Sequence, residues 1–522
     1  MFGGWTVEDA FVTTSGLWAL PLDPRAAAAL WQQLYHGLRA AILDGRLPPG
    51  TRLPSTRDLA TELAVSRTTV LNAFEQLLAE GYVEGRVGSG SYVARALPED
   101  LLTVERGIAR LAGRPQRPGS LSQRGALLTT LPLGLFQARG RALRPFLPWT
   151  PALDAFPVHL WASLVQRYWG NAPPELLGRG DPAGYRPLRE AIAAYLGPAR
   201  GVRCEPEQVI LVAGMQQAFD LAARVLLDPD DVVWMEDPGY VGARGSFTAA
   251  GARVVPIPID DEGIDVDTAI PGSPAARLVY VTPSHQYPLG VTMSLRRRLA
   301  LLDWASRAGA WLLEDDYDSE YRYAGRPLAA LQGLDRDGRV IYLGTFDKVL
   351  FPALCLGYVV VPPDLLDAFV AARSLVSRHA PSIDQAVVAD FMTEGHFGRH
   401  IRRMRLLYAE RQAALVEAAS QRLSGLLEVR PSDAGMHLIG WLPEGVDDGT
   451  IAEVAASHGL EVPPLSAHSA RPLTRGGLLL GYTAFAPGQI RGAVTALARF
   501  LEATIGAPGG NRTVSLGPAE MR

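Results

Sequence analysis

Lys348 is the only lysine in this 522-residue chain, because Lys and Arg together number 50 and every other member of that set is an arginine. A Schiff base with an aldehyde needs a primary amine that can lose its proton, and a guanidinium group cannot supply one. Lys348 is therefore the first candidate for covalent catalysis. The alternative is a lysine left by chance on the surface of an arginine-rich chain, and its position must decide between the two.

Five apolar runs alternate with helical patterns in the larger part of the chain, which is typical of a mainly parallel sheet covered by helices on both faces. The runs are QVILVA, DVVWME, ARLVYVT, AWLLEDD and RVIYLGTF. Ligands in such folds bind beyond the carboxyl ends of the strands. The polar segments AGMQQ, EDPGY, TPSHQYPLG, EDDYDSEY and GTFDK fall at those ends, and the last of them finishes with Lys348. Lys348 therefore belongs to a predicted binding site.

The N-terminal part of the chain predicts a compact DNA-binding unit. A helical stretch covers about 27–43, and two short helical patterns follow near Arg57–Leu63 and Arg67–Glu80, the first with Ser55 or Thr56 as its N-cap. The segment GYVEGRVGSGSYV then gives two short β-like runs around a Gly/Ser turn, which is a hairpin signal. This order is the layout of a winged helix-turn-helix, whose second motif helix enters the major groove.

The segment GRLPPGTRLPSTRDLATELAVSRTTVLNAFEQLLAEGYVEGRVGSGSYV resembles the GntR-type DNA-binding domain nearly from end to end. The resemblance implies that the partner is double-stranded promoter DNA. The N–H groups at the start of a helix can bind a phosphate, and an arginine can form a bidentate hydrogen bond with guanine. A glycine in the wing lets the backbone approach the minor groove closely. Taken singly, each polar residue could instead belong to a solvated helix face. The candidate DNA-binding residues are Arg52, Arg57, Ser66, Arg67, Thr68, Thr69, Asn72, Arg86 and Gly88.

The strand-and-helix part resembles the fold-type I aminotransferases, which use pyridoxal 5'-phosphate. GTFDKVLFPALCLGYVVVP, EDDYDSEYRY and TPSHQYPLG are especially similar to the MocR subfamily, in which a GntR-type domain is fused to an aminotransferase-like domain and regulates transcription. The resemblance covers about 27–93 and 146–500. It implies a multidomain fold, with a winged helix-turn-helix followed by an α/β fold-type I domain around a mainly parallel central sheet, and pyridoxal 5'-phosphate as the cofactor.

The same resemblance implies a role for each residue of the cofactor site. Lys348 forms the Schiff base, and Asp315 lies by the pyridine nitrogen, where a carboxylate keeps the ring protonated. Asp315 as a helix cap and Tyr240 as a core residue are the structural alternatives. The other cofactor-binding candidates are Tyr317 at the phenolic oxygen, Tyr240 on the ring, His285, Gln286 and Tyr287 in the loop over the ring's oxygen side, and Gly214, Met215 and Thr345 at the phosphate.

Three positions depart from the family pattern. Cys355 stands where members commonly carry an arginine that contacts the phosphate, and Arg179 stands where they often carry a tyrosine that reaches the neighbouring subunit's phosphate. We hypothesise that Arg179 supplies in trans the charge missing at Cys355; weaker phosphate binding is the alternative. Leu478 stands where aminotransferases hold the ligand carboxylate with an arginine, which argues against efficient transamination. Arg471 and Arg475 are near in sequence, but the sequence places neither in the pocket.

Composition excludes several classes of protein. Hydrophobic residues make up 48% of the chain and the formal net charge is −4, which excludes a disordered chain and a basic nucleic-acid coat. Two cysteines cannot build a disulfide framework, and zinc-ligand spacings are absent, so no metal is expected. No apolar run reaches the roughly 18 residues of a membrane span. We expect a cytoplasmic protein without a membrane partner.

The segment between the two predicted units is irregular in pattern and rich in arginine. A flexible segment of about 50 residues spans roughly 40 Å, enough to carry the N-terminal unit across a dimer partner, so a domain-swapped homodimer is expected. The expected division is an N-terminal extension at 1–26, the DNA-binding domain at 27–95, a linker at 96–145, the aminotransferase-like domain at 146–505 and a disordered tail at 506–522.

The leading hypothesis is a transcription regulator that binds pyridoxal 5'-phosphate at Lys348, senses a small-molecule amine or the cofactor itself, and alters its binding to promoters. The competing hypothesis is an active aminotransferase with an appended DNA-binding domain. The retained Lys348 and Asp315 support it, whereas the missing carboxylate arginine and the complete winged helix oppose it. We therefore expect residual half-transamination and no physiological turnover. A third hypothesis, DNA binding with an empty cofactor pocket, follows if Cys355 abolishes affinity.

Overall fold

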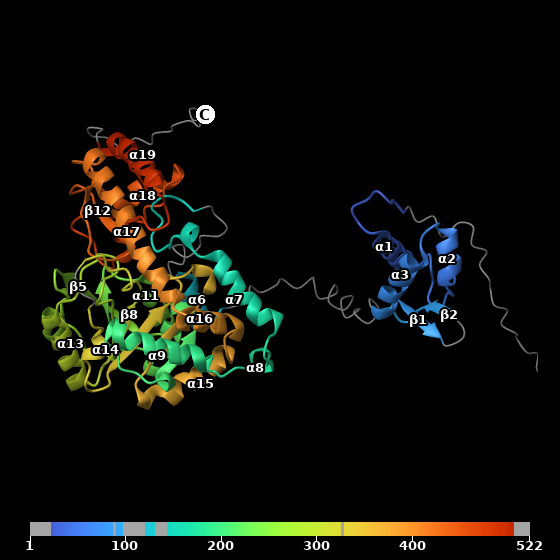
Figure 1. The fold of residues 1–522 in the computed structure, drawn as a ribbon, viewed down its shortest axis with the longest axis horizontal. Coiled ribbons are helices and arrows are strands. Elements are labelled where there is room, and N and C mark those ends of the chain that lie inside the picture. Colours follow the sequence, from blue (N-terminus) through green and yellow to red (C-terminus); the bar gives the residue numbers. More distant parts are fainter. Residues whose placement is uncertain (1–21, 87–89, 98–120, 131–142, 325–327, 506–522) are drawn as a thin grey trace, which may run out of the picture. The chain divides into compact units, whose positions relative to one another are not determined.

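The computed structural model describes residues 22–86, 90–97, 121–130, 143–324 and 328–505 of the chain (Figure 1). The chain divides into two compact units, Met1–Ser120 and Leu121–Arg522, and each is described by itself. Gly88, the expected tail, and most of the expected N-terminal extension and linker lie outside the described residues. The boundaries of these segments therefore stay predictions.

The N-terminal unit has the order of elements that the sequence predicts. The side chain of Ser55 caps the first motif helix by accepting from Asp58 N–H at 3.2 Å, and Ser66 caps the second by accepting from Thr69 N–H at 3.1 Å. The two strands pair antiparallel. The described elements are α1 (Leu30–Leu43), α2 (Thr56–Glu62), α3 (Arg67–Ala79), β1 (Val83–Arg86) and β2 (Gly90–Val93).

A single apolar cluster forms the core of this unit. Val70, Phe74 and Leu77 on α3 are buried against Leu34 and Leu38 on α1, as the helical spacing of these residues predicts. This stripe fixes the rotation of α3 about its axis, so the opposite face and the start of the helix remain exposed. The arrangement is the predicted winged helix-turn-helix.

The C-terminal unit is built on an eight-stranded sheet in the order β3-β10-β9-β8-β7-β4-β5-β6. Neighbours from β9 to β5 are parallel, whereas β10 is antiparallel to both of its neighbours and β6 is antiparallel to β5. The predicted mainly parallel sheet is confirmed. The strands are β3 (Val209–Val212), β4 (Val232–Asp237), β5 (Arg253–Asp260), β6 (Gly263–Ile264), β7 (Leu278–Val281), β8 (Trp311–Asp316), β9 (Val340–Thr345) and β10 (Gly357–Val360).

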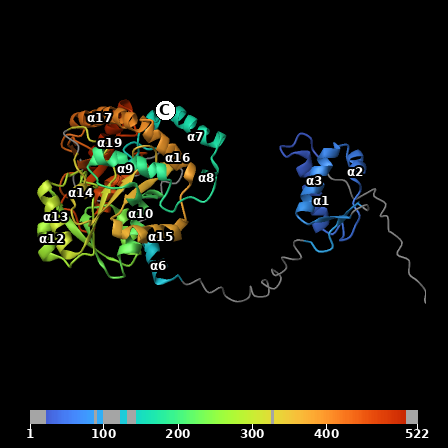
Figure 2. The same ribbon diagram turned by 60° about the horizontal axis from the view of Figure 1, so that its bottom comes forward.

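Helices cover both faces of this sheet because its central strands turn apolar side chains to both sides. On β3, Ile210 and Val212 pack with α10, whereas Val209 and Leu211 pack on the opposite face with α9 and α16 (Figure 2). None of the described helices is long and apolar enough to cross a membrane. The helices up to the end of the sheet are α6 (Gln123–Thr130), α7 (Val158–Gly170), α8 (Pro174–Leu177), α9 (Arg186–Arg200), α10 (Gly214–Leu226), α11 (Val241–Ala249), α12 (Val266–Gly272), α13 (Leu295–Ala308), α14 (Leu331–Leu334), α15 (Leu366–Ser377) and α16 (Ser382–Thr393).

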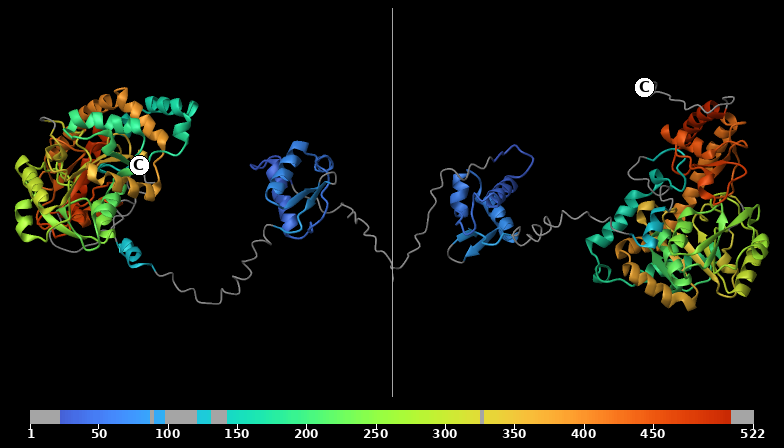
Figure 3. Two further views of the ribbon diagram at one scale, coloured as in Figure 1. Left: turned by 90° about the horizontal axis from the view of Figure 1, so that it is seen from below. Right: turned by 180° about the vertical axis from the view of Figure 1, so that it is seen from behind.

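A second, smaller sheet follows in the same unit, with strands in the antiparallel order β11-β12-β13. Helices α17 and α19 pack side by side against it around a core that includes Tyr408 and Leu497 (Figures 1 and 3). A bridge from Phe146 to Gly481 brings the segment before α7 onto β13. The elements are α17 (His396–Arg422), β11 (Glu428–Val429), β12 (His437–Trp441), α18 (Asp448–Ser457), β13 (Gly477–Gly481) and α19 (Pro487–Ile505).

Candidate functional site

Lys348 lies just after β9 at the carboxyl edge of the large sheet, where the sequence predicts it. Its side chain is partly buried, and burial holds the pKa of the amine below the ordinary value for lysine, against the opposing charges of Asp347, Asp315 and Asp318. The Tyr321 hydroxyl donates to the Lys348 carbonyl oxygen at 3.3 Å and supports the backbone there. An amine in this setting loses its proton more readily than one on the surface, which Schiff-base formation requires.

Asp315 is the last residue but one of β8, and its buried carboxyl interacts electrostatically with this amine. The Tyr280 hydroxyl donates to its Oδ2 at 2.7 Å, whereas its Oδ1 is buried without a hydrogen-bond partner among the described residues. Burial raises the pKa of the Asp315 carboxyl to about 7. The carboxyl caps no helix, so that structural alternative does not apply. Its free oxygen suits a ligand that carries an N–H group.

Glu236, at the end of β4, is a second buried acid that sequence reasoning missed. Its Oε2 accepts from the hydroxyl and the backbone N–H of Thr282, at 2.6 and 3.1 Å, whereas Oε1 has no partner in the described part of the chain. Burial raises the pKa of this carboxyl to about 7. Gln286 donates to the Pro238 carbonyl at 3.0 Å and reaches Glu236 at 3.4 Å. Gln286 therefore holds this loop in place.

His285 joins two residues of the segment that follows β8. Its Nδ1 lies 3.0 Å from the Tyr317 hydroxyl and 3.0 Å from Asp318 Oδ2, and all three side chains are buried. His285 Nε2 has no partner among the described residues. Asp318 was not predicted, although it stands three positions after Asp315 in EDDYDSEY. The structure thus brings His285 and Tyr317 together, as the resemblance implies.

Aromatic rings line the side of the site formed by the loops after β4 and β7. The Tyr240 ring, just before α11, lies 5.9 Å from Phe219 and 5.6 Å from Tyr287, and it stands nearly perpendicular to Tyr287. Tyr287 in turn lies 5.9 Å from Tyr317. Tyr240 is only partly buried. Its position therefore fits stacking on a planar ring better than a role in the core.

The predicted phosphate site lies at the start of α10. Gly214 has φ +74°, a backbone conformation that favours glycine, and the first N–H groups of the helix, including that of Met215, have no acceptor within it. Thr345 Oγ1 accepts from Asp347 N–H at 3.1 Å. A Cβ on Gly214 would lie 3.4 Å from Cys355 Sγ and 3.7 Å from Asp347 Oδ2. A thiol and a carboxyl therefore border this helix start.

Arg179 is exposed on the loop between α8 and α9. The loop rests on the start of α16, since a Cβ on Gly180 would lie 3.1 Å from Ser382 Oγ and 3.2 Å from His379 Nδ1. Among the described residues, the atoms within 4 Å of a Cβ on Gly214 belong to Cys355 and Asp347 and not to Arg179. The trans role predicted for Arg179 therefore requires a second copy of the chain.

The arginines near the expected carboxylate clamp are engaged elsewhere. Leu478 is fully buried in β13. Arg475 forms an ion pair with Glu428 at 2.9 Å, and Arg471 lies 3.1 Å from Asp237 Oδ2. Each of these two guanidinium groups is paired with a carboxylate, and neither stands at the position of Leu478.

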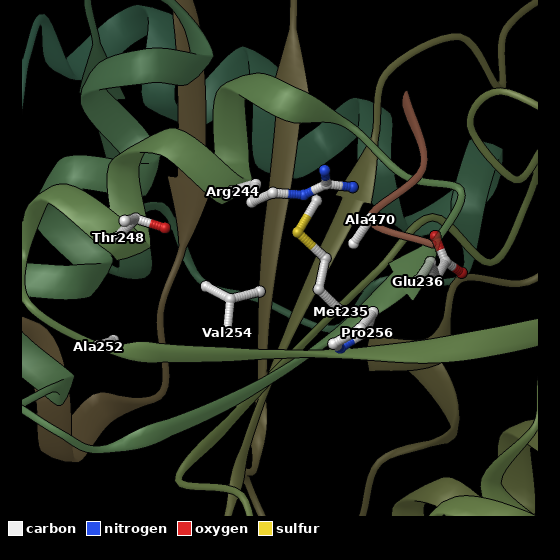
Figure 4. Close-up of a pocket in the computed structure, with 8 residues that line it drawn as sticks. All are labelled: Met235, Glu236, Arg244, Thr248, Ala252, Val254, Pro256 and Ala470. Carbon is white, nitrogen blue, oxygen red and sulfur yellow. The ribbon is translucent and has the colours of Figure 1, made fainter. Parts of the chain in front are cut away.

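Two cavities border the site. The first, of about 320 Å³, lies where Arg244 and Thr248 on α11 approach β4 and β5 (Figure 4), and it is lined by Met235, Glu236, Arg244, Thr248, Ala252, Val254, Pro256 and Ala470. The second, of about 370 Å³, reaches His285 from the other side, and its lining includes Tyr195, Arg200, Ser284, Glu320, Arg402 and Arg405. Glu236 and His285 each line a cavity and belong to the site.

The ring end of the site fits pyridoxal phosphate. Asp315 Oδ1 is a buried acceptor without a hydrogen-bond partner in the part of the chain that the structure describes, and the Lys348 amine interacts electrostatically with this carboxyl. The phosphate end offers a helix start and Thr345, but burial raises the pKa of Asp347, which borders it, to about 6. The described residues that border this helix start, Cys355 and Asp347, supply no positive charge for a phosphate.

The DNA-binding candidates gather at the starts of α2 and α3 and on the hairpin. Thr69 is partly buried, and Arg67 Nε lies 3.4 Å from the Thr56 hydroxyl. The Arg86 guanidinium lies over the Tyr92 ring, 4.6 Å from its centroid. Gly88 lies outside the described residues. The exposed candidates are Arg52, Arg57, Ser66, Arg67, Thr68, Asn72 and Arg86.

Comparisons with known proteins match the two halves separately. Residues 30–93 match the bacterial regulatory proteins of the gntR family, and residues 157–473 match aminotransferase class I and II. The probable rhizopine catabolism regulatory protein MocR of Rhizobium meliloti is 44% identical over 92% of this chain and 95% of that protein. The HTH-type pyridoxine biosynthesis transcriptional regulator PdxR of Corynebacterium glutamicum is 31% identical over 89% and 94%.

A solved structure of kynurenine aminotransferase from Pyrococcus horikoshii, in complex with PMP, matches with a TM-score of 0.65 and 28% identity, over 78% of this chain and all of that one. The winged helix-turn-helix, the sheet that carries Lys348 at its carboxyl edge and the full-length relatives agree with one another. The chain therefore belongs to the MocR family of GntR-type regulators and is a pyridoxal phosphate-dependent transcription regulator.

Proposed function

We propose that an amine effector, or the cofactor itself, acts at Lys348 and changes how the GntR-type domain binds promoter DNA in the cytoplasm. The observation that carries this proposal is the placement of the chain's only lysine in a partly buried site bordered by Asp315, Asp347 and Asp318. A ligand controls DNA binding only if it binds two states of the protein unequally. The effector site must therefore differ between those states.

Each residue of the site has a part in holding the cofactor. Pyridoxal phosphate supplies an aldehyde that condenses reversibly with primary amines. Lys348 presents such an amine, and its lowered pKa leaves more of it unprotonated. Asp315 accepts a ring N–H through the oxygen that has no protein partner, and the first N–H groups of α10 bind phosphate. His285 orients the Tyr317 hydroxyl from 3.0 Å.

Two kinds of effector agree with the descriptions of two relatives and with the absence of an arginine at position 478. One relative is described as a probable regulator of rhizopine catabolism and another as a regulator of pyridoxine biosynthesis. The absence of an arginine at Leu478 disfavours ligands that depend on an α-carboxylate. The effector is therefore an amine without that group or the cofactor itself.

A route from the site toward the linker is visible within the C-terminal unit. Helix α11 begins directly after Tyr240, and α6, which lies in the predicted linker, packs against α11. A ligand that shifts Tyr240 would therefore also shift the surface on which α6 rests. This contact supports coupling between the cofactor site and the linker.

We propose a domain-swapped homodimer in which Arg179 of each copy reaches the phosphate site of the other. Arg179→Ala should then weaken cofactor affinity at least tenfold, since an arginine–phosphate pair is a charge-assisted contact. Titration of the full-length apoprotein, followed by visible absorbance, measures this affinity. Arg307→Ala is the control, because Arg307 is exposed and pairs with Asp303 on α13. Equal affinity of Arg179→Ala and the unmodified protein would refute the trans contact.

The retained Lys348 and Asp315 also support a second candidate function, an aminotransferase with an appended DNA-binding domain. Incubation of the loaded protein with a panel of amino acids, followed by cofactor absorbance and by binding to promoter fragments, separates the two. The regulator predicts slow or absent conversion to the pyridoxamine form together with altered DNA binding. Rapid conversion with repeated turnover would establish the enzyme instead.

A further inference from the structure

Four aromatic side chains form a cage beside the cofactor site: Trp149, Tyr287, His437 and His468. The Trp149 ring lies 5.5 Å from Tyr287, 6.4 Å from His437 and 6.3 Å from His468. Tyr287 lies 5.3 Å from His468 and 5.9 Å from His437. Tyr287 also packs 5.9 Å from Tyr317, so the cage is continuous with the cofactor site.

The cage contains buried polar atoms that no described residue of the protein satisfies. Trp149 Nε1, His437 Nδ1 and the neighbouring His285 Nε2 are buried without hydrogen-bond partners among the described residues. His437 is itself almost completely buried, and its ring lies 5.9 Å from that of His285. Buried polar groups in proteins are almost always hydrogen-bonded. Three unsatisfied nitrogens on adjacent rings therefore point to a polar ligand.

Hydrogen-bond geometry fixes what the ligand must offer. His437 Nε2 lies 2.9 Å from the Pro288 carbonyl oxygen, which can only accept, so Nε2 carries the proton. Burial lowers the pKa of His437 to about 4, and the ring is neutral. Its Nδ1 is then a bare acceptor, whereas Trp149 Nε1 is only a donor. A hydroxyl group satisfies both atoms, while a carboxylate can accept from Trp149 but offers nothing to His437.

The backbone at Trp149 supports a binding role. Its φ is +60°, in the left-handed region that side chains other than glycine rarely adopt. Such conformations cost free energy and cluster at ligand sites. The Phe146–Gly481 bridge, with Gly481 N–H donating to Phe146 O at 2.9 Å, holds this segment against β13. The fold therefore holds the Trp149 ring against the other three rings of the cage, although the backbone conformation at Trp149 costs free energy.

Positive charge near the cage is already neutralised. Arg244 donates to the His468 carbonyl oxygen at 2.8 Å and lies 3.7 Å from Asp237, and Arg471 lies 3.1 Å from the same carboxylate. A carboxylate ligand would have to compete with Asp237 for either guanidinium. A neutral hydroxylated group would not.

We propose that this cage recognises the body of a hydroxylated primary amine that lacks a carboxylate, while the amine group of that ligand faces Lys348. The proposal rests on the proposed function and names the chemical class of its effector. Trp149 and His437 determine the specificity, because they present one donor and one acceptor that a single hydroxyl can satisfy.

Three amines with the same 2-amino three-carbon skeleton test this specificity: 2-amino-1,3-propanediol, L-serine and isopropylamine. Calorimetric titration of the full-length, cofactor-loaded protein gives the affinity of each, corrected for its unprotonated fraction. The diol should bind at least about fivefold tighter than isopropylamine, because its hydroxyl adds one or two hydrogen bonds. It should also bind tighter than L-serine, whose carboxylate would have to compete with Asp237 for a guanidinium. L-serine binding as tightly as the diol, or more tightly, overturns the proposal.

Trp149→Phe keeps the ring and removes only the donor. The preference for the diol over isopropylamine should fall about fivefold in this variant, and it should remain unchanged in the control Trp169→Phe, whose ring is exposed on α7. His437→Phe, which removes the acceptor, is the second variant if Trp149→Phe does not fold. An unchanged preference in a folded variant contradicts the assignment of that residue.

The outcomes also separate this inference from the proposed function. If the protein binds cofactor but none of the three amines, the cage proposal is wrong, while regulation by the cofactor itself survives. If the protein does not bind cofactor at all, the proposed function is wrong. If L-serine binds best and alters DNA binding, the function stands and the cage assignment is overturned.

Discussion

The amine of Lys348 lies among three carboxyl groups whose charges oppose the effect of burial on its pKa. Two of these groups have raised pKa values because they are buried, Asp315 at about 7 and Asp347 at about 6. The cofactor affects them in opposite directions. A ring N–H beside Asp315 favours the carboxylate, whereas a phosphate near Asp347 favours the protonated acid.

Asp347→Asn should therefore strengthen cofactor binding. The asparagine Oδ1 can still accept from Leu356 N–H, as Asp347 does at 3.0 Å, but the charge beside the phosphate site is removed. We expect about tenfold tighter binding at pH 8, the equivalent of one pKa unit of repulsion. Because Asp347 is protonated below about pH 6, the difference between the two proteins should shrink as the pH falls from 8 to 5.

Absorbance titrations of the two apoproteins at several pH values measure this effect. Asp303→Asn serves as the control, because Asp303 is exposed on α13 and pairs only with Arg307 among the described residues. An Asp347→Asn variant with unchanged affinity at pH 8, or with an advantage that grows toward low pH, would show that Asp347 does not face the phosphate.

Only part of the site could be predicted from single residues. Lys348 stands out because no other lysine exists, and Asp315 because it follows an apolar strand. In the sequence, Glu236 cannot be distinguished from other acids near strand ends. Its burial depends on the contact with Thr282, which directly follows β7, the neighbour of β4 in the sheet. Trp149 gave no signal, since its role depends on a left-handed backbone and on rings from three distant segments. Such contacts exist only in the folded chain.

Helix α17 reaches the turn that carries the lysine. His400 on this helix lies with Nε2 2.9 Å from the Val349 carbonyl oxygen, one residue after Lys348. The ring is buried, and burial lowers the pKa of His400 to about 4. Since the carbonyl only accepts, the neutral ring donates to it. The smaller sheet's longest helix thus helps to hold the backbone of the cofactor site.

This contact predicts a pH dependence of stability with a defined sign. The unfolded chain protonates His400 near pH 6.5, whereas the folded protein does so only near pH 4, so stability is full above pH 6.5 and is lost as the pH falls toward 4. Between pH 7 and pH 5, the unmodified protein should lose about 2 kcal/mol more than His400→Leu. Denaturant unfolding at both pH values measures this, and other titrating groups cancel in the comparison.

The variant His458→Leu is the matched control for the loss of a histidine side chain, because His458 is exposed at the end of α18. The same loss of stability in the unmodified protein and in His400→Leu would contradict the buried, neutral state of His400. A smaller loss in the unmodified protein would reverse the predicted sign.

The start of α3 carries a separate prediction. Arg67 is exposed at the first position of the predicted recognition helix. If it contacts a DNA phosphate, Arg67→Ala should weaken binding to a random-sequence duplex and lower the slope of log affinity against log salt by about 0.9. Fluorescence anisotropy at several salt concentrations measures the slope. Arg46→Ala, which removes an exposed arginine paired with Asp44, should leave it unchanged; equal slopes for all three proteins would contradict the contact.

The sequence predicted the elements with long, regular patterns and missed those with short or interrupted ones. The five apolar runs became β3, β4, β7, β8 and β9, and the helices of the DNA-binding unit lie where their spacing and serine caps place them. Strand β5 contains two prolines, which argue against a strand, yet it pairs with β4 on one side and with β6 on the other. The smaller sheet joins strands from distant segments. Helix α6 is a single short helix whose contact with α11 no local pattern reveals.

At the scale of the whole molecule, two units with separate cores must act together. The buried core of the N-terminal unit is formed by residues of that unit alone. Regulation therefore depends on what connects them. A cofactor or effector that binds equally to both DNA-binding states would change nothing, however tightly it bound.

The proposed regulation depends on a covalent bond between pyridoxal phosphate and the amine of Lys348. The direct measurement is borohydride reduction of the full-length, cofactor-loaded protein followed by peptide mass analysis, which is unambiguous because the chain has a single lysine. We predict a permanent cofactor adduct on the peptide that contains Lys348. A protein that absorbs as the cofactor complex but carries no adduct on that peptide, or carries it elsewhere, would contradict the central claim.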